Sequence, residues 1–231
     1  MPRLFRKVSF FQFILFIFLF YHISFLRVSH YYTFNIKSQV SRILKRVDRI
    51  DTSITNQNNM SDEFDGKIYK SFQSTNNSKE KVVSFTLNSD GVEFGSCTNL
   101  SLWPVYLVIN EISLNERFSF QNIIVAGLAV TYHKPDRKAF IRPIVDQLKQ
   151  LEVGTAFILK NGREDIVKCF LLYGIFDKPA RSHFLNTKLC TGFYGCIRCY
   201  QRGESFMSPM NSKILNYLKN LNIFIHVYYN N

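Results

Sequence analysis

The sequence predicts an α/β domain in which helices pack on a mixed sheet. Strand-like apolar runs occupy residues 82–88, 103–109, 122–130, 155–160 and 166–176. A helical pattern over residues 141–151 lies between the third and fourth of these runs. Three strands followed by a helix and further strands are typical of a mixed sheet with flanking helices.

The first 30 residues form the most apolar part of the chain. Arg3, Arg6 and Lys7 precede an apolar stretch over residues 8–26. Its length is close to the roughly 20 residues of a membrane-spanning helix, and no small-residue cleavage site follows it. We therefore expect a hydrophobic helix over residues 1–30, with residues 8–26 as a candidate membrane anchor. The alternative is chance translation of AT-rich noncoding DNA, which also yields Phe, Ile, Leu, Tyr and Asn.

Residues 31–55 predict a basic amphipathic helix. Its apolar stripe consists of Ile36, Val40, Ile43, Val47, Ile50 and Ile54. The stripe is too short for a coiled coil, so we expect it to pack on its own domain, with a membrane-surface or partner helix as the alternative. Residues 56–80 are rich in Asn, Ser, Thr and Gln and predict a polar linker, in which residues 66–70 are the one patterned segment.

The patterned core extends over residues 81–206. In the helix expected over residues 141–151, one face carries Ile141, Ile144, Val145, Leu148 and Leu151. Pro143 is tolerated there because it falls in the first turn. A second helix is expected to begin near Pro179, after an apolar run that looks fully buried. Residues 207–231 change composition toward Asn, Ile and Tyr and read as an unrelated tail.

Charge and cysteine content exclude two simple interpretations. The formal net charge is +12, but the first 50 residues alone contribute +8, so the core is nearly balanced. Total charge is therefore no evidence for nucleic-acid binding. The five cysteines are an odd number without an even framework, which argues against a secreted disulfide scaffold.

Two carboxylates follow predicted core strands. Asp90 lies in a Ser-Asp-Gly turn after the strand at residues 82–88, and Asp177 follows the strand at residues 166–176. Each has a structural alternative, since Ser-Asp-Gly is a common turn and Asp177 could cap the next helix. Taken together they predict ligands for Mg²⁺ or Mn²⁺, which prefer carboxylate oxygens. Two such ions about 4 Å apart can activate a water and stabilise a leaving 3′ oxygen.

Several blocks of the core, in this order, carry a resemblance to a known family. They read SDGVEFGSCTNLSLWPVYLVINEI, FQNIIVAGLAV, FIRPIVDQLKQLEVG, CFLLYGIFDKPAR and GFYGCIRCYQRGE. Over roughly residues 66–204 the chain resembles the catalytic core of CACTA (En/Spm-type) transposases. The resemblance implies a partial RNase H-like fold, DNA as partner and a nuclear location. It also implies that Asp90 and Asp177 are the first two residues of an acidic catalytic triad.

The chain departs from this pattern where the third acid is expected. After Asp177 the only carboxylate is Glu204, and it lies directly after the cysteine pair. We therefore expect a truncated and inactive transposase relative. The resemblance also assigns Cys196 and Cys199 to a zinc-binding insertion. They supply half of a tetrahedral zinc site, so a pair of ordinary reduced cysteines is the favoured alternative.

Other residues carry weaker expectations. Cys190 and His183 are candidates to complete a zinc site, and a set of basic residues could contact DNA phosphates: Arg137, Lys138, Arg142, Arg181, Arg198 and Arg202. The aromatic residues Trp103, Tyr106, Phe118 and Phe120 are expected to pack rather than to stack on bases. His133 and His183 are expected to have no catalytic task.

Two other function classes stay open at this point. The first is a non-catalytic protein that binds DNA or a partner, for which salt-sensitive binding without metal-dependent cleavage is expected. The second is a protein tethered to a membrane by its N-terminal helix.

Overall fold

The protein is described by a computed structural model that divides into two units. The unit of residues Met1–Ile175 holds the main sheet, and the unit of residues Phe176–Asn231 holds α6 and a small hairpin. The structure describes the following parts of the chain: residues 29–47, 62–75, 81–94, 99–189, 192–196 and 202, and the backbone of strands 204–207 and 213–216.

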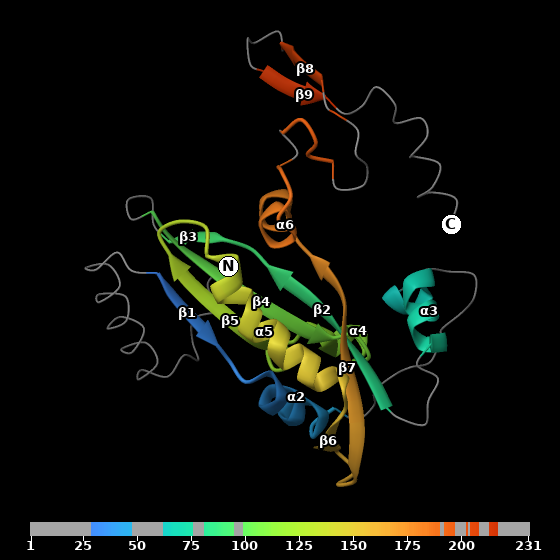
Figure 1. Ribbon diagram of the computed structural model, residues 1–231. Coiled ribbons are helices and arrows are strands. Elements are labelled where there is room, and N and C mark those ends of the chain that lie inside the picture. Colours follow the sequence, from blue (N-terminus) through green and yellow to red (C-terminus); the bar gives the residue numbers. More distant parts are fainter. Residues whose placement is uncertain are drawn as a thin grey trace. The chain divides into compact units, whose positions relative to one another are not determined.

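The first unit is built on a seven-stranded mixed sheet (Figure 1). Its strands are β1 (His30–Thr33), β2 (Lys81–Ser89), β3 (Val92–Phe94), β4 (Leu100–Ile109), β5 (Ile124–Thr131), β6 (Thr155–Ile158) and β7 (Glu164–Ile175). The strand order is β1-β5-β4-β2-β7-β6, and β3 pairs with β4 outside this path. The pair β2–β7 is parallel and the other pairs are antiparallel. The mixed sheet predicted from the apolar runs is confirmed.

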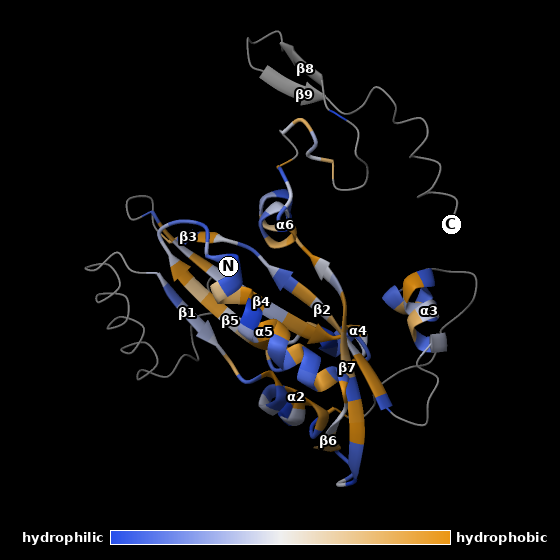
Figure 2. Cartoon of the chain, viewed as in Figure 1, coloured by the Kyte–Doolittle hydropathy of each residue, from blue (hydrophilic) through white to orange (hydrophobic). Residues whose placement is uncertain are grey.

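Helix α5 (Arg137–Glu152) covers one face of this sheet (Figure 1). Its apolar residues Phe140, Ile144, Leu148 and Leu151 are buried, and apolar residues also concentrate along the strands (Figure 2). The helix approaches β5 closely at Gly127, where an added Cβ would lie 2.8 Å from Ile144 Cδ1. The predicted helix therefore exists, but it begins at Arg137, four residues earlier than predicted, because Asp136 caps it through the Ala139 amide. Pro143 thus lies inside the helix, and the expectation that it falls in the first turn is wrong.

Residues predicted as one basic amphipathic helix form a strand followed by a helix. Residues His30–Thr33 pair with β5 as edge strand β1, and α2 (Ile36–Leu44) begins after the Asn35 cap. The buried face of α2 consists of Ile36, Val40, Ile43 and Leu44, so this helix packs on its own domain. The apolar stripe beyond Val47 lies outside the described residues.

Part of the segment predicted as a linker is folded. It contains the short 3₁₀ helix η1 (Glu63–Asp65) and α3 (Lys67–Thr75). Phe64 and Tyr69 are buried, with ring centroids 4.7 Å apart. Composition favoured a linker because few large apolar residues occur here, and of these Phe64 and Tyr69 pack while Ile68 is 73% exposed.

Strand β7 is less buried than its apolar sequence indicated. Val167 and Cys169 are fully buried, whereas Ile166 and Ile175 are 57% and 58% exposed. The expectation of a fully buried run is therefore wrong for much of the strand. One face of β7 receives α5, and the exposed side chains belong to positions that the described elements leave uncovered.

The second unit begins with α6 (Lys178–Leu185), as predicted from Pro179. Strands β8 (Glu204–Met207) and β9 (Lys213–Asn216) pair with each other as a two-stranded antiparallel sheet. Strand β9 falls in the segment that composition indicated as an unrelated tail.

The hydrophobic helix expected over residues 1–30, with its candidate anchor at residues 8–26, lies almost wholly outside the described residues. Among the helices that the structure describes, none combines the length and the hydrophobicity needed to span a bilayer.

Candidate functional site

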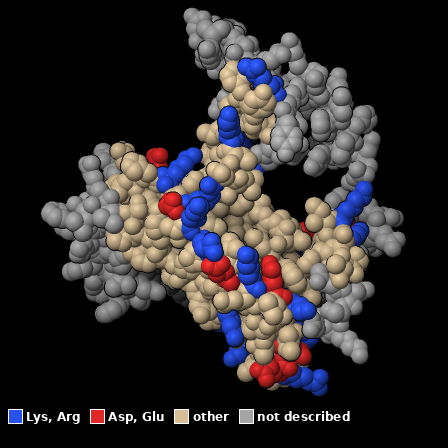
Figure 3. Space-filling model, in the orientation of Figure 1, with Lys and Arg blue, Asp and Glu red and all other residues tan. Residues whose placement is uncertain are grey.

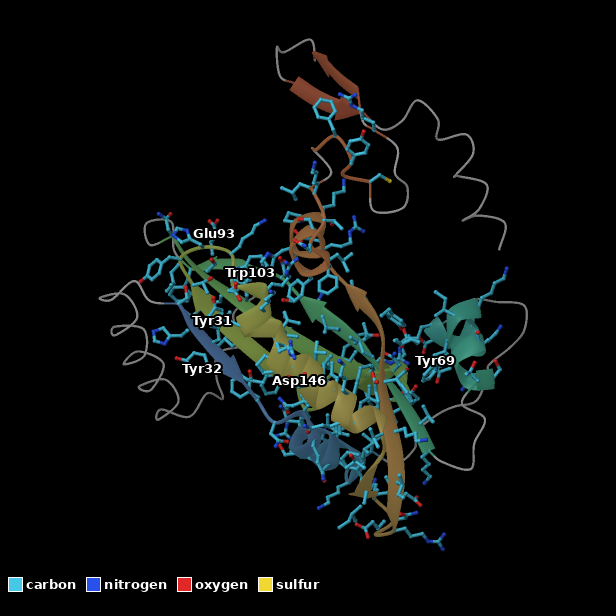
Figure 4. The ribbon with its side chains drawn as sticks, in the orientation of Figure 1. Tyr31, Tyr32, Tyr69, Glu93, Trp103 and Asp146 are labelled. Carbon is cyan, nitrogen blue, oxygen red and sulfur yellow. The ribbon has the colours of Figure 1, made fainter. Side chains whose placement is uncertain are left out.

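Asp90 lies in the turn that connects β2 to β3, and its side chain is exposed. The turn needs glycine at the next position because the indole of Trp103 packs directly against Gly91. A Cβ at Gly91 would lie 2.5 Å from Trp103 Cζ2, closer than any real contact. Trp103, labelled in Figure 4, is 7% exposed. Packing between β4 and the turn therefore fixes the backbone that presents Asp90.

The Asp90 carboxylate suits a hard divalent cation. Among the described residues it forms no hydrogen bond and no ion pair, so both oxygens remain available as ligands. The preceding residue, Ser89, is fully buried, and its hydroxyl has no hydrogen-bond partner in the described part of the chain.

Strand β7 lies beside β2 and ends at the same edge of the sheet. The two strands run parallel, with Asn88 opposite Ile175. The side chain of Asn88 donates from Nδ2 to the Ile175 carbonyl at 2.8 Å. Asp90 follows the end of β2 by one residue, and in the sequence Asp177 follows the end of β7 by two.

Asp177 belongs to the second unit, where it caps α6. Its Oδ1 accepts a hydrogen bond from the Ala180 amide at 2.7 Å, and its side chain is exposed. The structural alternative proposed for this residue, a helix cap, is therefore realised. The cap occupies one carboxylate oxygen and leaves Oδ2 without a partner among the described residues.

The zinc hypothesis falls partly outside the described residues. Cys196 is half-buried and unoxidised, whereas Cys199 and Cys190 are not described. His183 lies on α6, and its ring packs edge to face with the Phe184 ring, with 5.8 Å between the two ring centroids. Within the described ranges, no three His, Cys, Asp or Glu side chains gather as a metal site.

The aromatic residues predicted to pack divide into two groups. Trp103 packs as expected. Tyr106, on β4, is partly covered at 37% exposed. Phe118 and Phe120 are 61% and 91% exposed, so the prediction that they pack is wrong. They lie in the loop between α4 (Leu114–Arg117) and β5, where few described residues cover them.

The predicted phosphate-binding residues that the structure describes in the first unit are interspersed with acidic ones. Arg142 is exposed and lies 3.7 Å from Asp146, and acidic side chains are interspersed among the basic ones (Figure 3). Lys138 is exposed, Arg137 and Arg181 are half-buried, and Arg198 is not described. In the second unit, the Arg202 guanidinium lies over the Phe193 ring, 5.1 Å from its centroid. His133 is exposed.

A buried polar cluster was missed in the sequence. Glu111 is 1% exposed. Its Oε2 accepts from the Ser84 amide at 2.8 Å, while its Oε1 accepts from the Ser84 hydroxyl at 2.7 Å and the Tyr69 hydroxyl at 3.0 Å. Asn110 joins the cluster by donating to Ser84 Oγ at 3.0 Å and accepting from Thr86 at 2.6 Å. The cluster therefore holds the end of β4 to β2 and also ties α3 to the sheet (Figure 4).

Burial controls ionisation in this cluster. It raises the pKa of Glu111 from its usual value of 4.5 to about 6, because desolvation outweighs the hydrogen bonds from Ser84. Burial, together with the nearby Glu111 carboxylate, raises the pKa of Cys169 to about 12. A carboxylate this deeply buried cannot contact DNA, so the cluster supports the fold rather than the chemistry.

A second buried anchor connects η1 to α4. The Arg117 side chain is 1% exposed, and its two terminal nitrogens both lie 2.8 Å from the Asp62 carboxylate oxygens. It also contacts Glu63 at 2.7 Å and donates to the Ile112 carbonyl at 3.0 Å. Burial alone would raise the pKa of Asp62, but the hydrogen bonds from Arg117 hold that pKa below its usual value.

Comparison with known proteins identifies the family. The sequence model of the transposase family tnp2 matches residues 57–225, which is most of the chain. The match includes the segment with η1 and α3 and extends past residue 206, where we expected the resemblance to end. No curated protein matches the chain. Because the family match covers strands β2 to β7, the Asp90 turn and α6, and thus most of the chain, the chain belongs to the tnp2 family of transposases.

Proposed function

We propose that the first unit is part of an RNase H-like catalytic core of a CACTA (En/Spm-type) cut-and-paste DNA transposase. The observation that carries the proposal is the position of β2. This strand lies between antiparallel β4 and parallel β7, and Asp90 follows it directly. An RNase H-like core has three antiparallel strands, then a helix that crosses the sheet, then a strand that runs parallel to the first and lies beside it. Here these elements are β2, β4 and β5, then α5, then β7.

In this proposal Asp90 and Asp177 are the first two metal-binding carboxylates. The register that places Asn88 opposite Ile175 supports the pairing, because it brings the carboxyl ends of β2 and β7 to one edge of the sheet. When bound there, Mg²⁺ or Mn²⁺ would activate a water for phosphodiester hydrolysis. Asp90 would bind the metal through a carboxylate that its turn holds in place. Asp177 would bind it through Oδ2, because Oδ1 accepts the hydrogen bond that caps α6.

We propose further that these 231 residues do not cut DNA by themselves. Beyond Asp177 the sequence contains one carboxylate, Glu204. Two carboxylates are too few to hold two metal ions in the geometry that in-line displacement needs. A third carboxylate would have to come from outside these 231 residues.

Binding of Mn²⁺ to the purified chain tests the carboxylate assignment. Titration calorimetry is carried out on the protein and on the variants Asp90→Asn, Asp177→Asn and Asp136→Asn. Asp136 is the matched control, because it caps α5 through the Ala139 amide at 2.7 Å as Asp177 caps α6. We expect the first two variants to weaken Mn²⁺ binding at least tenfold and the control to leave it unchanged. Equal binding by all four proteins would remove both carboxylates from the proposed site.

Incubation of the same proteins with end-labelled duplex DNA and Mn²⁺ tests the expected inactivity. We expect no metal-dependent strand cleavage by any of them. Cleavage by the unmodified chain that disappears in Asp90→Asn would show that the third carboxylate is not needed, and would overturn this part of the proposal.

The second candidate function is DNA binding without catalysis. It is favoured by membership of a transposase family together with the single carboxylate after Asp177. It predicts an affinity for duplex DNA that falls steeply with salt and does not depend on divalent metal.

A further inference from the structure

Three large apolar side chains are exposed together at the loop that connects α4 to β5. Leu114 is 51% exposed, Phe118 61% and Phe120 91%. All three fall within seven consecutive residues, so they form one aromatic tip rather than scattered surface positions. Large apolar side chains that gather on a surface mark an interaction site.

The basic end of α2 lies beside this aromatic tip. Arg46 donates from Nη2 to the Gln121 carbonyl at 2.7 Å and to Asn122 Oδ1 at 2.5 Å. Arg42 and Lys45 are exposed, and Arg42 shares the side of Arg46, four residues away. Residues 29–47 contain no Asp or Glu. Arg46 thus tethers the loop to a helix end whose described charges are all positive, with Asp48 the next acidic residue in the sequence.

The tip and Asp90 lie apart along β4. Asp90 is beside the middle of this strand, since Ser89 pairs with Val105 and Gly91 contacts Trp103, and β4 runs on from there to Ile109. α4 and the aromatic tip follow that far end. Whatever binds the tip is therefore not held by the proposed metal site.

The combination of exposed rings and cations matches unpaired nucleotides. Bases that are not in a duplex stack on aromatic side chains, while Lys and Arg neutralise the adjoining phosphates. A duplex hides its base faces and would use the cations alone. Within residues 114–120 the only acidic residue of the sequence is Glu116, and one negative charge does not outweigh the positive charges of Arg42 and Lys45.

A lipid surface fits the same residues less well. Helices that lie in a membrane interface present a continuous apolar face. The apolar face of α2 is buried in the domain, α4 has four residues, and the tip alternates with Asn115, Ser119 and Gln121.

We infer that Phe118 and Phe120, together with Arg42 and Lys45, bind single-stranded nucleic acid at a site separate from Asp90. The site takes unpaired bases on the two rings and phosphates on the two cations. Arg46 holds the loop in place through Gln121 and Asn122. The inference goes beyond the proposed function, because it needs neither metal nor catalysis.

Fluorescence anisotropy with a labelled oligo(dT) of about 12 nucleotides tests the site, with a duplex of equal length for comparison. The aromatic variant is Phe118→Ser/Phe120→Ser, and the charge variant is Arg42→Gln/Lys45→Gln. Matched controls are Val153→Ser, which removes a side chain that is 79% exposed, and Lys149→Gln/Arg163→Gln, which removes two exposed charges elsewhere. All variants change exposed side chains, and circular dichroism checks that they remain folded.

The aromatic variant should bind the single strand about tenfold more weakly and the duplex about as well as before, since stacking requires unpaired bases. For the single strand, the charge variant should make the negative slope of log K against log[salt] shallower by about 1.4, because each lost phosphate contact accounts for about 0.7. Neither control should reproduce these effects. Equal losses for single strand and duplex in the aromatic variant would overturn the inference. So would Phe-dependent binding to anionic phospholipid vesicles without any Phe-dependent binding to oligo(dT).

Discussion

The indole of Trp103 on β4 lies against the Cα of Gly91, the residue that follows Asp90. A side chain at position 91 would have its Cβ 2.5 Å from Cζ2, 2.6 Å from Cε2 and 2.9 Å from Cη2 of that ring. The ring is rigid and 7% exposed, so it has no room to turn away. The conformation of the Asp90 turn therefore depends on a side chain from the neighbouring strand.

Gly91→Ala is expected to destabilise the protein by about 1–3 kcal/mol, the usual cost of overpacking. Urea denaturation followed by circular dichroism measures the loss in this variant and in the next, which lacks Trp103, the only tryptophan of the sequence. The double variant Gly91→Ala/Trp103→Phe should recover part of the loss, because the smaller ring makes room for the methyl group. An unchanged stability in Gly91→Ala would show that the turn is not held by this contact.

Arg117→Met is expected to cost about 3 kcal/mol, because it leaves the Asp62 and Glu63 carboxylates without their buried cation. Hydrogen exchange should accelerate most in residues 62–75, because this arginine holds their first turn to α4. Arg142→Gln is the control. Its ion pair with Asp146 is 3.7 Å long, with side chains 80% and 54% exposed, so it should change stability by less than about 0.5 kcal/mol.

The ionisation of Glu111 predicts a dependence of stability on pH. Its pKa is about 6 in the folded protein and is expected near 4.5 in the unfolded chain, so the folded state binds the proton more tightly. Proton binding by Glu111 therefore stabilises the folded state by about 2 kcal/mol below pH 4.5. This stabilisation is lost as the pH rises through about 6.

Replacing Glu111 with Gln should remove this contribution. The amide oxygen can accept from the Ser84 amide, and the two hydroxyls can rotate to accept from the NH₂ group. The difference in unfolding free energy between the protein and Glu111→Gln, measured from pH 4 to pH 7.5, should therefore change by about 2 kcal/mol. A difference that is constant over this range would contradict the assigned pKa.

The parts of the fold that were predictable are those with a strong local signal. Strands β2, β4 and β5 and helix α5 each bury several apolar residues at their own period, and their positions follow from the sequence within a few residues. The strand β1 was not predictable, because His-Tyr-Tyr-Thr is short and takes its conformation from pairing with β5, almost 100 residues away.

In the candidate site, too, the sequence could not predict what depends on contacts between distant segments. The sequence places both Asp90 and Glu111 just after an apolar strand, so one local signal marks two acids with opposite environments. Glu111 is buried because α3 brings Tyr69 over it, and that docking depends on packing between distant segments. Asp90 stays exposed because it lies in the turn that follows its strand. Tertiary packing, which no local pattern records, decides which carboxylate can meet a substrate.

The buried thiol of Cys169 is expected to resist alkylation. Its pKa of about 12 leaves almost no thiolate at pH 8, and the side chain is fully buried. Mass spectrometry after treatment with iodoacetamide should find Cys169 modified in urea but unmodified in the folded protein. Rapid modification of Cys169 in the folded protein would show that β7 opens from the sheet.

Asp177 is expected to act on α6 through its cap, whatever its role toward metal. Asp177→Ala removes the acceptor of the Ala180 amide and should cost about 1 kcal/mol, whereas Asp177→Asn keeps an acceptor oxygen and should cost only a few tenths. Hydrogen exchange at the Ala180 amide separates the two variants, because only Asp177→Ala should accelerate it. If Asp177→Asn loses Mn²⁺ while the Ala180 amide stays protected, the loss belongs to the carboxylate charge and not to an unravelled helix. If both variants expose that amide, the Mn²⁺ result for Asp177 cannot be assigned to metal binding, and the proposed site would rest on Asp90 alone.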